Sequence, residues 1–524
     1  MTSVLAGPAS PEAKPSYEEF AECYMRGESQ VVWTRLIADL ETPVSAYMKL
    51  AHGQSMSFLL ESVEGGATRG RYSVIGLDPD VVWRAHSDRA EINRQPAKDP
   101  GKFETDTAPA LASLRALLAS SRLTLPLDLP PMAAGVFGYM GYDTIRLVEH
   151  LPGQKPDDLG VPDAVLMRPT IIVIFDSVRD EMCLVTPVRP DPSAAAQEAW
   201  SLAHARLAKL IERLEGPIAH PASSAPSIAV VHQEPKSNTT AAEYLGMVAK
   251  AKEYIRAGDI FQVVLSQRFS TPFTLPPFTL YRALRRLNPS PFLFHLDFGG
   301  FALVGSSPEI LVRVRDGQVT IRPIAGTSQR GATEAEDRAL GEALLKDPKE
   351  RAEHLMLLDL GRNDVGRVAK TGTVEVTDQF VIERYSHVMH IVSNVIGELD
   401  PAHDTVDALM AGFPAGTVSG APKVRAMQVI DELEKSKRGA YAGCVGYFTA
   451  DGEMDTAIVL RTGLVKDGML HVQAGAGVVY DSIPENEQQE CINKAKAVVR
   501  AAEEAVRLVN GPKSGRSGNG GLFG

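Results

Sequence analysis

The sequence has few cysteines and no long apolar runs. Four cysteines are spread over 524 residues, and none forms a C-x-x-C pair. This spacing excludes a secreted disulfide framework and predicts reduced thiols in a reducing compartment. No stretch of 18 apolar residues occurs, and the first 16 residues lack the basic start and apolar run of a secretory signal. We therefore expect a cytoplasmic protein that does not enter a membrane.

An excess of positive charge is also missing. Lysine and arginine total 54 against 65 acidic residues, which gives a formal net charge of −11. Such a chain has no general attraction for nucleic acid or for an anionic lipid surface. An anionic substrate would need local compensation from a metal ion, a basic side chain or exposed backbone amides.

Several common catalytic signatures are absent. The sequence contains no G-x-x-x-x-G-K-[ST], no H-E-x-x-H and no G-x-S-x-G. Their absence argues against P-loop nucleotide binding, zinc-protease chemistry and the common serine hydrolases. No cysteine has the local context of a catalytic nucleophile, so we expect no glutaminase activity in this chain.

The length and composition predict two globular domains. A chain of 524 residues exceeds one ordinary core, and 44% hydrophobic with 23% charged residues is typical of a soluble protein. A stretch rich in proline, alanine and serine marks a linker at 216–238. We predict tails at 1–15 and 509–524, an N-terminal domain at 16–215 and a second domain at 239–508.

Apolar periodicity predicts strands and helices that alternate along both domains. Before the linker, helices are expected at 107–120 and 194–214, and strands at 57–60, 81–84, 133–138 and 170–175. After it, helices are expected at 241–257, 279–287, 333–345, 349–361 and 485–508, and strands at 261–269, 302–305, 311–315, 441–448 and 469–479. The alternation predicts a mixed α/β fold.

Two of the expected helices carry paired glutamates on one face. Glu350 and Glu353 are three residues apart, as are Glu487 and Glu490, with Lys494 one turn later. A single pair is more often a solvated surface, by roughly four to one. If both pairs converge, their carboxylates repel one another unless a divalent cation lies between them. Oxygen ligands favour magnesium, which takes only one or two carboxylates directly.

Glycine-rich turns and isolated basic residues are weaker signals. Gly326, and the glycines Gly475 and Gly477 on either side of Ala476, let the backbone approach an anion closely. Such turns, however, usually mark only a bend in the chain. Residues 414–423 resemble a phosphate loop only in composition. Arg461 ends an apolar strand, where an arginine either pairs internally or holds a carboxylate. His390 lies in an apolar stretch, where a satisfied core histidine is the commoner outcome.

Taken together and in order, these segments resemble the chorismate-using enzymes, and within them the large components of anthranilate synthases. The matching stretches are 258–264, 305–309, 322–327, 350–354, 362–364, 414–423 and 475–477. The likeness is strong over residues 232–505 and thinner before them, chiefly at 59–62 and 71–76. It implies a four-layered αββα sandwich, two stacked sheets with helices outside, to which two intertwined domains contribute.

The resemblance also implies roles for individual residues. Glu353 and Glu490 look like direct magnesium ligands, with Glu350 and Glu487 acting through water, and the metal would hold the ring carboxylate of chorismate. The site for the enolpyruvyl carboxylate looks like Tyr441, Arg461 and the amides of Gly475, Ala476 and Gly477, with Gly326 and Thr327 against the ring. The residues that resemble the catalytic set are Glu309, His390, Gln262, Thr417 and Lys494.

The chemistry of the family fits these groups. Ammonia must attack the ring diene while the ring hydroxyl leaves as water, so a general acid is required, and Glu309 resembles it. Pyruvate is then eliminated with loss of a ring proton. His390 resembles the residue that assists this step in the family. Relatives that add water carry lysine where Gln262 stands, and aminodeoxychorismate synthases carry lysine where Ala325 stands. The resemblance therefore favours anthranilate as the product.

The resemblance further implies feedback inhibition by tryptophan at a site that bridges both halves of the chain. Its residues would be Glu61, Ser62, Pro291, Phe292, Leu293, Val445 and Tyr447. The family usually has tyrosine and methionine where Phe292 and Leu293 stand, which keeps the wall apolar but removes a hydroxyl. The alternative, that 59–62 is only a strand end with a surface serine, keeps about one chance in four.

Other functions stay open at this point. They are the sibling aminodeoxychorismate synthase activity, a catalytically inactive regulatory protein of the same fold, and an unrelated acidic cation-binding protein. For the favoured function, the partners implied are chorismate, ammonia, tryptophan and a separate glutamine amidotransferase small subunit. A heterotetramer of two large and two small subunits is expected.

Overall fold

The structure is a computed structural model that describes residues 13–510 except 52, 65–67, 154, 219–233 and 386–387. The expected tails and most of the expected linker lie outside the described residues. Two predicted boundaries shift slightly. Lys14 exchanges two backbone hydrogen bonds of 2.8 Å with Trp33, so the end of the predicted N-terminal tail is part of the fold. The last helix continues to Asn510, beyond the predicted end at 508.

Eleven α-helices are seen in the described part of the chain. They are α1 (Tyr17–Met25), α2 (Pro43–Leu50), α3 (Ala110–Ser120), α4 (Ala196–Glu215), α5 (Ala241–Ala257), α6 (Pro277–Leu287), α7 (Glu334–Lys346), α8 (Pro348–Gly366), α9 (Thr405–Gly412), α10 (Lys423–Leu433) and α11 (Pro484–Asn510). Capping boxes begin α1, α2, α5 and α9, because side chains there satisfy first-turn amides that have no partner within the helix.

The described part of the chain also contains twenty-two strands. They are β1 (Gln30–Ile37), β2 (Ser57–Glu64), β3 (Thr68–His86), β4 (Arg89–Asn93), β5 (Glu104–Pro109), β6 (Gly135–Met140), β7 (Ala164–Asp176), β8 (Glu181–Val188), β9 (Lys236–Ser237), β10 (Gln262–Pro272), β11 (Phe292–Asp297), β12 (Ala302–Ser307), β13 (Ile310–Arg315), β14 (Gln318–Ile321), β15 (Ile324–Gln329), β16 (Glu375–Arg384), β17 (Val388–Glu398), β18 (Gly420–Ala421), β19 (Cys444–Thr449), β20 (Met454–Ile458), β21 (Thr462–Lys466) and β22 (Met469–Val478).

Two sheets share the long strands β3 and β7. One runs β1-β8-β7-β3-β2-β11-β12-β21-β22-β10. The other runs β4-β3-β7-β6-β19-β20-β13-β14-β17. The register of β3 on β7 shifts between Pro79 and Val81, where the strands pass from one sheet to the other. Every ladder named here is antiparallel, so the mixed fold is of the α+β kind.

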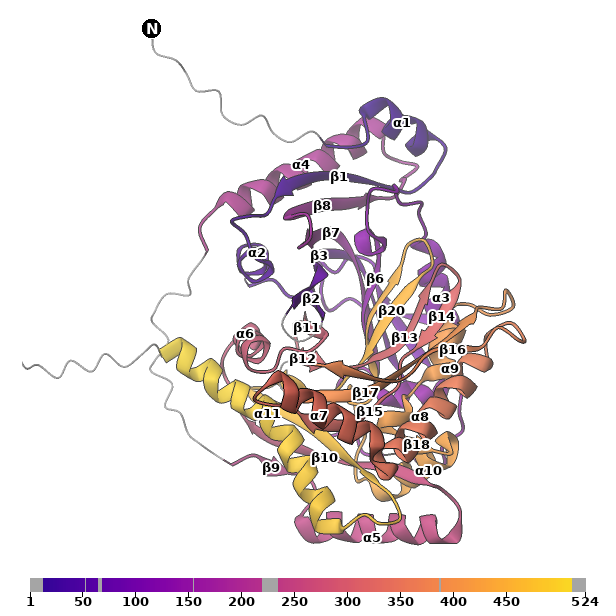
Figure 1. Ribbon diagram of the computed structural model, residues 1–524. Helices are drawn as coiled ribbons and strands as arrows, with labels where there is room; N and C mark the ends of the chain where they lie inside the picture. The colour runs from indigo at the N-terminus through magenta and orange to yellow at the C-terminus, as the bar shows by residue number, and fades with distance from the viewer. Residues whose placement is uncertain are drawn as a thin grey trace, which may run out of the picture.

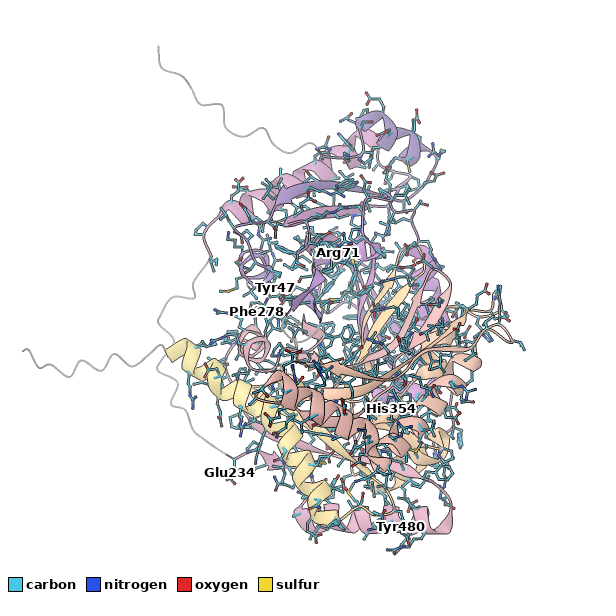
Figure 2. The ribbon with its side chains drawn as sticks, in the orientation of Figure 1. Tyr47, Arg71, Glu234, Phe278, His354 and Tyr480 are labelled. Atoms are coloured by element: carbon cyan, nitrogen blue, oxygen red, sulfur yellow. The ribbon has the colours of Figure 1, made fainter. Side chains whose placement is uncertain are left out.

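Helices cover the outer face of each sheet, which gives four layers (Figure 1). Residues of β2, β6, β11 and β19 fill the space between the sheets, where the rings of Phe58 and Phe137 stack at 4.6 Å. The first sheet packs against α2, α4, α6 and α11, with Tyr47 stacked on Phe278 at 4.4 Å (Figure 2). The second packs against α3, α8 and α9, while α5 and α10 pack on β10 at the end of the first sheet. The predicted αββα sandwich is confirmed.

The two halves of the chain are joined within the sheets themselves. Strand β2 pairs with β11 and β6 pairs with β19, so each sheet joins a block of strands from before the expected linker to a block from after it. None of the helices in the described ranges is long and apolar enough to cross a bilayer. The four cysteines are free thiols, three of them buried.

Candidate active site

A cavity of about 620 Å³ opens between α11, the end of α6 and the strand ends beside β17 and β21. Its walls include Pro308, Tyr385, His390, Arg461, Glu490 and Lys494. Four of these residues, His390, Arg461, Glu490 and Lys494, are candidates singled out from the sequence, and Pro308 precedes a fifth, Glu309. The fold therefore brings together residues more than 180 positions apart in the chain.

Arg461 is the unpaired cation of this cavity. It stands between β20 and β21 with a positive φ of 49°, and Ser306 donates a backbone hydrogen bond of 3.3 Å to its carbonyl. Among the described residues its guanidinium has no carboxylate partner, and burial lowers its pKa. A partly buried cation without a carboxylate partner is costly, so the position suits an anionic ligand.

His390 is held in one orientation on β17. Its Nδ1 lies 2.9 Å from the carbonyl oxygen of Gly326, which requires Nδ1 to donate, and 3.2 Å from the hydroxyl of Thr327. Nε2 is then the basic nitrogen. Burial lowers the pKa of the ring, and the charge of Arg461 lowers it further. The imidazole is therefore a neutral base beside Arg461, with the lone pair on Nε2.

Glu309 is a buried carboxyl next to the cavity wall at Pro308. Burial raises its pKa to about 8, while the hydroxyl of Thr417 and the amide of Ile324 partly oppose the shift. Glu309 and Thr417 line a second, much smaller pocket together with residues of α8. The Thr417 hydroxyl makes no hydrogen bond of good geometry with any described residue. At neutral pH the Glu309 carboxyl is mostly protonated and can donate a proton.

The loop that carries Thr417 is fixed on α8. Nζ of Lys423 lies 2.8 Å from Asp364, and both side chains are buried. A Cβ on Gly416 would lie 2.4 Å from the side chain of Leu360, so only glycine allows this close packing. The composition of 414–423 thus serves tight packing against the helix.

The acidic faces of α8 and α11 approach each other. Burial raises the pKa of Glu350, and the charges of Glu353 and Glu490 raise it further. Burial also raises the pKa of Glu487, with Glu490 adding to the shift. Lys494 makes an ion pair of 2.7 Å with Glu490 and a 3.0 Å hydrogen bond to the carbonyl of Gly475. The charge of Glu490 on α11 thus acts on Glu350 on α8, while convergence of all four carboxylates on one metal ion stays a prediction.

No three histidine, cysteine, aspartate or glutamate side chains within the described ranges form a ready-made metal cage. Magnesium usually binds one or two carboxylates and keeps several waters, so a complete cage is not required. The four glutamates of α8 and α11 are oxygen donors that fit this ion, and two of them, Glu350 and Glu487, have pKa values raised chiefly by burial and further by neighbouring carboxylates.

Strands β10 and β22 supply the floor of the site. The amide nitrogen of Gln262 donates to Glu353 at 3.3 Å, which leaves its buried carbonyl oxygen without a partner among the described residues. A Cβ on Gly477 would lie 2.8 Å from the Gln262 amide nitrogen, and one on Gly475 would lie 2.9 Å from the Tyr441 hydroxyl. Ala476, between them, points into the core. The two glycines let functional side chains approach the strand.

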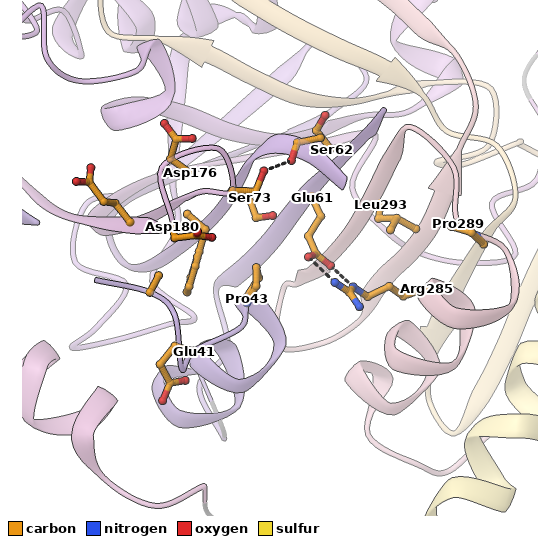
Figure 3. A pocket seen from close by; sticks show the side chains of 15 residues that line it. Glu41, Pro43, Glu61, Ser62, Ser73, Asp176, Asp180, Arg285, Pro289 and Leu293 are labelled. Carbon is orange, nitrogen blue, oxygen red and sulfur yellow. Dashed lines mark hydrogen bonds and ion pairs between the residues drawn. The ribbon is translucent and has the colours of Figure 1, made fainter. Parts of the chain in front are cut away.

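A second cavity of about 280 Å³ lies at the junction of β2, β11 and α6 (Figure 3). Glu61, Ser62, Leu293 and Arg285 line it. Glu61 is buried, and its carboxylate accepts hydrogen bonds of 2.6 and 3.1 Å from Arg285 and another from the Tyr281 hydroxyl. The cross-strand pairs Leu293–Glu61 and Phe292–Ser62 bring the two predicted inhibitor motifs together.

The other predicted inhibitor residues lie elsewhere. Phe292, Val445 and Tyr447 pack with Phe137 in the core between the sheets. Pro291 lines the larger cavity beside His390. The structure thus joins three of the seven predicted residues in one cavity and distributes four around it.

Comparison with known proteins decides the family. Residues 57–500 match the profile of a family described as chorismate binding enzyme. The chain belongs to the chorismate-binding enzymes. It is 56% identical over 505 residues to anthranilate synthase component 1 of Cereibacter sphaeroides, covering 96% of this chain and 100% of that protein. The component of the same name in Thermus thermophilus is 47% identical, covering 90% and 97%.

Solved structures agree with this family assignment. Anthranilate synthase component I of Streptococcus pneumoniae superposes with a TM-score of 0.71 at 38% identity, covering 89% of this chain and 99% of that one. The menaquinone-specific isochorismate synthase of Escherichia coli has a TM-score of 0.67 at 20% identity, covering 93% and 100%, and supports the fold alone.

Some contacts in this chorismate-binding enzyme were not expected from the sequence. The partners of Glu61, namely Tyr281 and Arg285, lie 220 and 224 positions away, and nothing in the local pattern pairs them. Their spacing of four on a helix could have shown only that they share a face. His354 likewise stood in a matched motif without a role, and its buried contacts are visible only in the fold.

Proposed function

We propose that this chain aminates chorismate with ammonia and eliminates pyruvate to give anthranilate, the first step of tryptophan biosynthesis. The observation that carries the proposal is an unpartnered cation, Arg461, on the wall of the larger cavity, together with a buried acid, Glu309, next to the wall residue Pro308. Chorismate is a dicarboxylate with a leaving hydroxyl, so it requires both. The relatives that share most of the chain's length carry the matching name.

The proposed first step forms a carbon–nitrogen bond and breaks a carbon–oxygen bond. Glu309 donates its proton to the ring hydroxyl, which leaves as water, and ammonia adds to the diene. Thr417, whose hydroxyl is otherwise unpaired, is placed to bind the departing oxygen. Gln262 has its amide nitrogen turned to Glu353, so its carbonyl oxygen is free to accept a hydrogen bond from ammonia.

The proposed second step restores the aromatic ring. A ring proton is removed with help from the lone pair on Nε2 of His390, and pyruvate leaves as its methyl carbon gains a proton. Arg461, the Tyr441 hydroxyl and the amides of Gly475, Ala476 and Gly477 would hold the enolpyruvyl carboxylate. The ring would lie against Gly326 and Thr327, which His390 already contacts.

Magnesium would be held by Glu353 and Glu490 directly, with Glu350 and Glu487 bonding to its waters. When bound, it supplies positive charge that orients and stabilises the ring carboxylate. Lys494 keeps Glu490 in place through their ion pair and adds positive potential. These assignments make the reaction that of a magnesium-dependent lyase.

The chain would obtain ammonia from a separate glutamine amidotransferase subunit, in a complex of two large and two small subunits. Beside Gln262, the surface exposes Phe261 at 68% and Tyr480 at 62%. Val263 pairs with Val478, which puts the two aromatic residues at matching positions where the strands end. An exposed apolar patch next to the proposed ammonia site is suited to such a partner. A cytoplasmic location fits this function.

We also propose that tryptophan inhibits the enzyme at the cavity beside Glu61 and Ser62. Residues 16–215 would form the domain that carries this site and 239–508 the chorismate-binding domain. Because β2 and β11 come from the two domains, a ligand there can favour one domain arrangement, and linkage requires chorismate to oppose it.

The test is to incubate the purified chain with chorismate and MgCl₂, adding either an ammonium salt or glutamine, and to follow anthranilate fluorescence. Ammonium should support turnover and glutamine should not, because no residue here is suited to releasing ammonia from an amide. Rapid glutamine-dependent turnover by the pure chain would refute this assignment. Formation of an amino product that retains the enolpyruvyl group would favour aminodeoxychorismate synthase, although Ala325 argues against it.

A further inference from the structure

His354 is a fully buried histidine that none of the roles above uses. Burial lowers its pKa to about 4, so the ring is neutral near pH 7. Its Nε2 lies 2.7 Å from Oγ of Ser393, whereas Nδ1 has no hydrogen-bond partner among the described residues. Figure 2 labels its position, which is on α8. A buried histidine with only one of its two ring nitrogens in a hydrogen bond is unusual and calls for a physical explanation.

The position of His354 on α8 gives that reason. It directly follows Glu353 and stands one helical turn after Glu350, but its own side chain points inward. Successive residues on a helix are about 100° apart, so fixing the direction of one fixes the next. Any contact that holds His354 therefore also sets where the Glu353 carboxylate points.

Ser393, the partner of His354, is itself held by the sheet. Its Oγ accepts the backbone amide of Phe380 at 3.1 Å, and its own amide donates to the carbonyl of Pro323 at 3.2 Å. Ser393 lies on β17, the strand that also carries His390. One side-chain contact thus joins the helix that bears the glutamates to the strand that bears the base.

Phe380 closes the remaining side of His354. Its ring lies edge-on at 4.8 Å from the imidazole, and the guanidinium of Arg351 lies 4.8 Å above it. Phe380 has a φ of 55°, a conformation that a bulky residue adopts only when its surroundings impose it. The Phe380 amide bond to Ser393 is one of those surroundings.

The acidic face of α8 lies close to β15. A Cβ on Gly326 would lie 3.1 Å from the Glu350 carboxylate oxygen, so a larger residue there would crowd the glutamate. We propose that His354 is a positioning residue, which through Ser393 fixes α8 on β17 and so sets the metal-binding geometry of Glu353. This inference rests on the proposed function, because it takes Glu353 as a metal ligand.

The experiment measures metal binding directly, with Mn²⁺ followed by electron paramagnetic resonance and the MgCl₂ concentration for half-maximal rate as a second readout. His354→Leu and Ser393→Ala should each weaken Mn²⁺ binding by roughly 10–100-fold, as changes behind a metal ligand do. His354→Gln, which can still reach the Ser393 hydroxyl, should recover most of the affinity. The double variant should be no worse than the worse single one, because both remove the same contact.

His295→Leu is the matched control. His295 is also buried, has an unpaired Nδ1 and a pKa lowered to about 3 by burial, but it lies on β11 in the core under α6. It should lower Tm without changing Mn²⁺ affinity. If the wild type binds Mn²⁺ and the His354 and Ser393 variants bind it equally well at lower Tm, the positioning role is wrong and the proposed function stands. If the wild type binds no Mn²⁺, the metal site and this inference both fail.

Discussion

The two cavities of this enzyme differ in whether the arginine on the cavity wall has a carboxylate partner. In the larger one, Arg461 has no carboxylate partner among the described residues, and the only acidic side chain among those that line it, Glu490, is paired with Lys494. In the smaller one, Glu61 is bound by both Arg285 and Tyr281, and Asp176 is bound by Arg71 at 3.0 Å. An arginine without a carboxylate partner marks the cavity where we propose chemistry, and an arginine paired with a buried glutamate marks the one where we propose inhibition.

The difference teaches how each cavity can bind a ligand. Burying a charge without a partner costs free energy that a ligand of opposite charge recovers on binding. A cavity whose charges are already paired gains less from a charged ligand, so its binding must come from shape and apolar contact. The following substitutions break or sharpen this contrast, in order of decreasing effect.

The largest effect is expected from the glutamates of α8 and α11. Glu353→Gln and Glu490→Gln should each nearly abolish activity, whereas Glu350→Gln and Glu487→Gln should be milder, because only the first pair is proposed to touch the metal. Rates measured across a MgCl₂ series for all four variants distinguish the pairs. Small and equal losses for all four would contradict the assignment.

The buried acid should give the next largest effect. Glu309→Gln keeps the shape of the side chain and removes its proton, so kcat should fall by about 10²–10⁴-fold with little change in the KM for chorismate. Stopped-flow fluorescence of anthranilate formation measures this. A loss below about tenfold would exclude Glu309 as the general acid.

The pH dependence follows from the same group. The Glu309 pKa is raised to about 8 by burial, and its protonated form is the active one, so kcat should decline as pH rises through about 8. The folded state binds this proton more tightly than the unfolded state, so its contribution to stability is lost as pH rises from the ordinary carboxyl range to about 8. Glu309→Gln should therefore gain in relative Tm at pH 9, and a variant that keeps the wild-type pH profile would contradict this.

Two arginine substitutions compare the cavities directly. Arg461→Gln should raise the KM for chorismate by roughly 10–100-fold, since a hydrogen bond to a charged group contributes about 1.5–3 kcal/mol. It should also raise Tm, because it removes a partly buried cation that has no carboxylate partner. Arg285→Gln should lower Tm, because it leaves the buried Glu61 carboxylate without its cation. If both variants change Tm in the same direction, the contrast between the cavities is wrong.

The smallest effect on the uninhibited rate is expected at Ser62. Wild type should be inhibited by tryptophan at or below millimolar concentration, and Ser62→Arg should not, because the larger side chain fills the cavity next to Glu61. Titration with tryptophan at fixed chorismate measures both. Equal inhibition of the two proteins would remove the inhibitor site from this cavity.

The sequence alone predicted much of the local structure. Helix α5 was predicted at its observed bounds, and α11 begins at Pro484, one residue before the prediction, because proline is suited to the first turn. Apolar periodicity and end signals lie within one segment, so a single sequence carries them. The order of motifs was also enough to identify the family.

The sequence could not decide which distant residues touch. The pairing of β2 with β11 and the contacts of Glu61 join positions 220 or more apart, and no local pattern encodes such a distance. The raised pKa of Glu309 depends on burial by many elements, so its letter in the sequence does not reveal it.

What the sequence determined is therefore the set of elements, the family and the chemical types available to the site. The tertiary structure decided which of them meet. It left Arg461 unpaired, paired Glu61 with Arg285, and placed His354 against Ser393. Packing decides these outcomes because solvation and partnership belong to the three-dimensional surroundings of a side chain, which many segments build together.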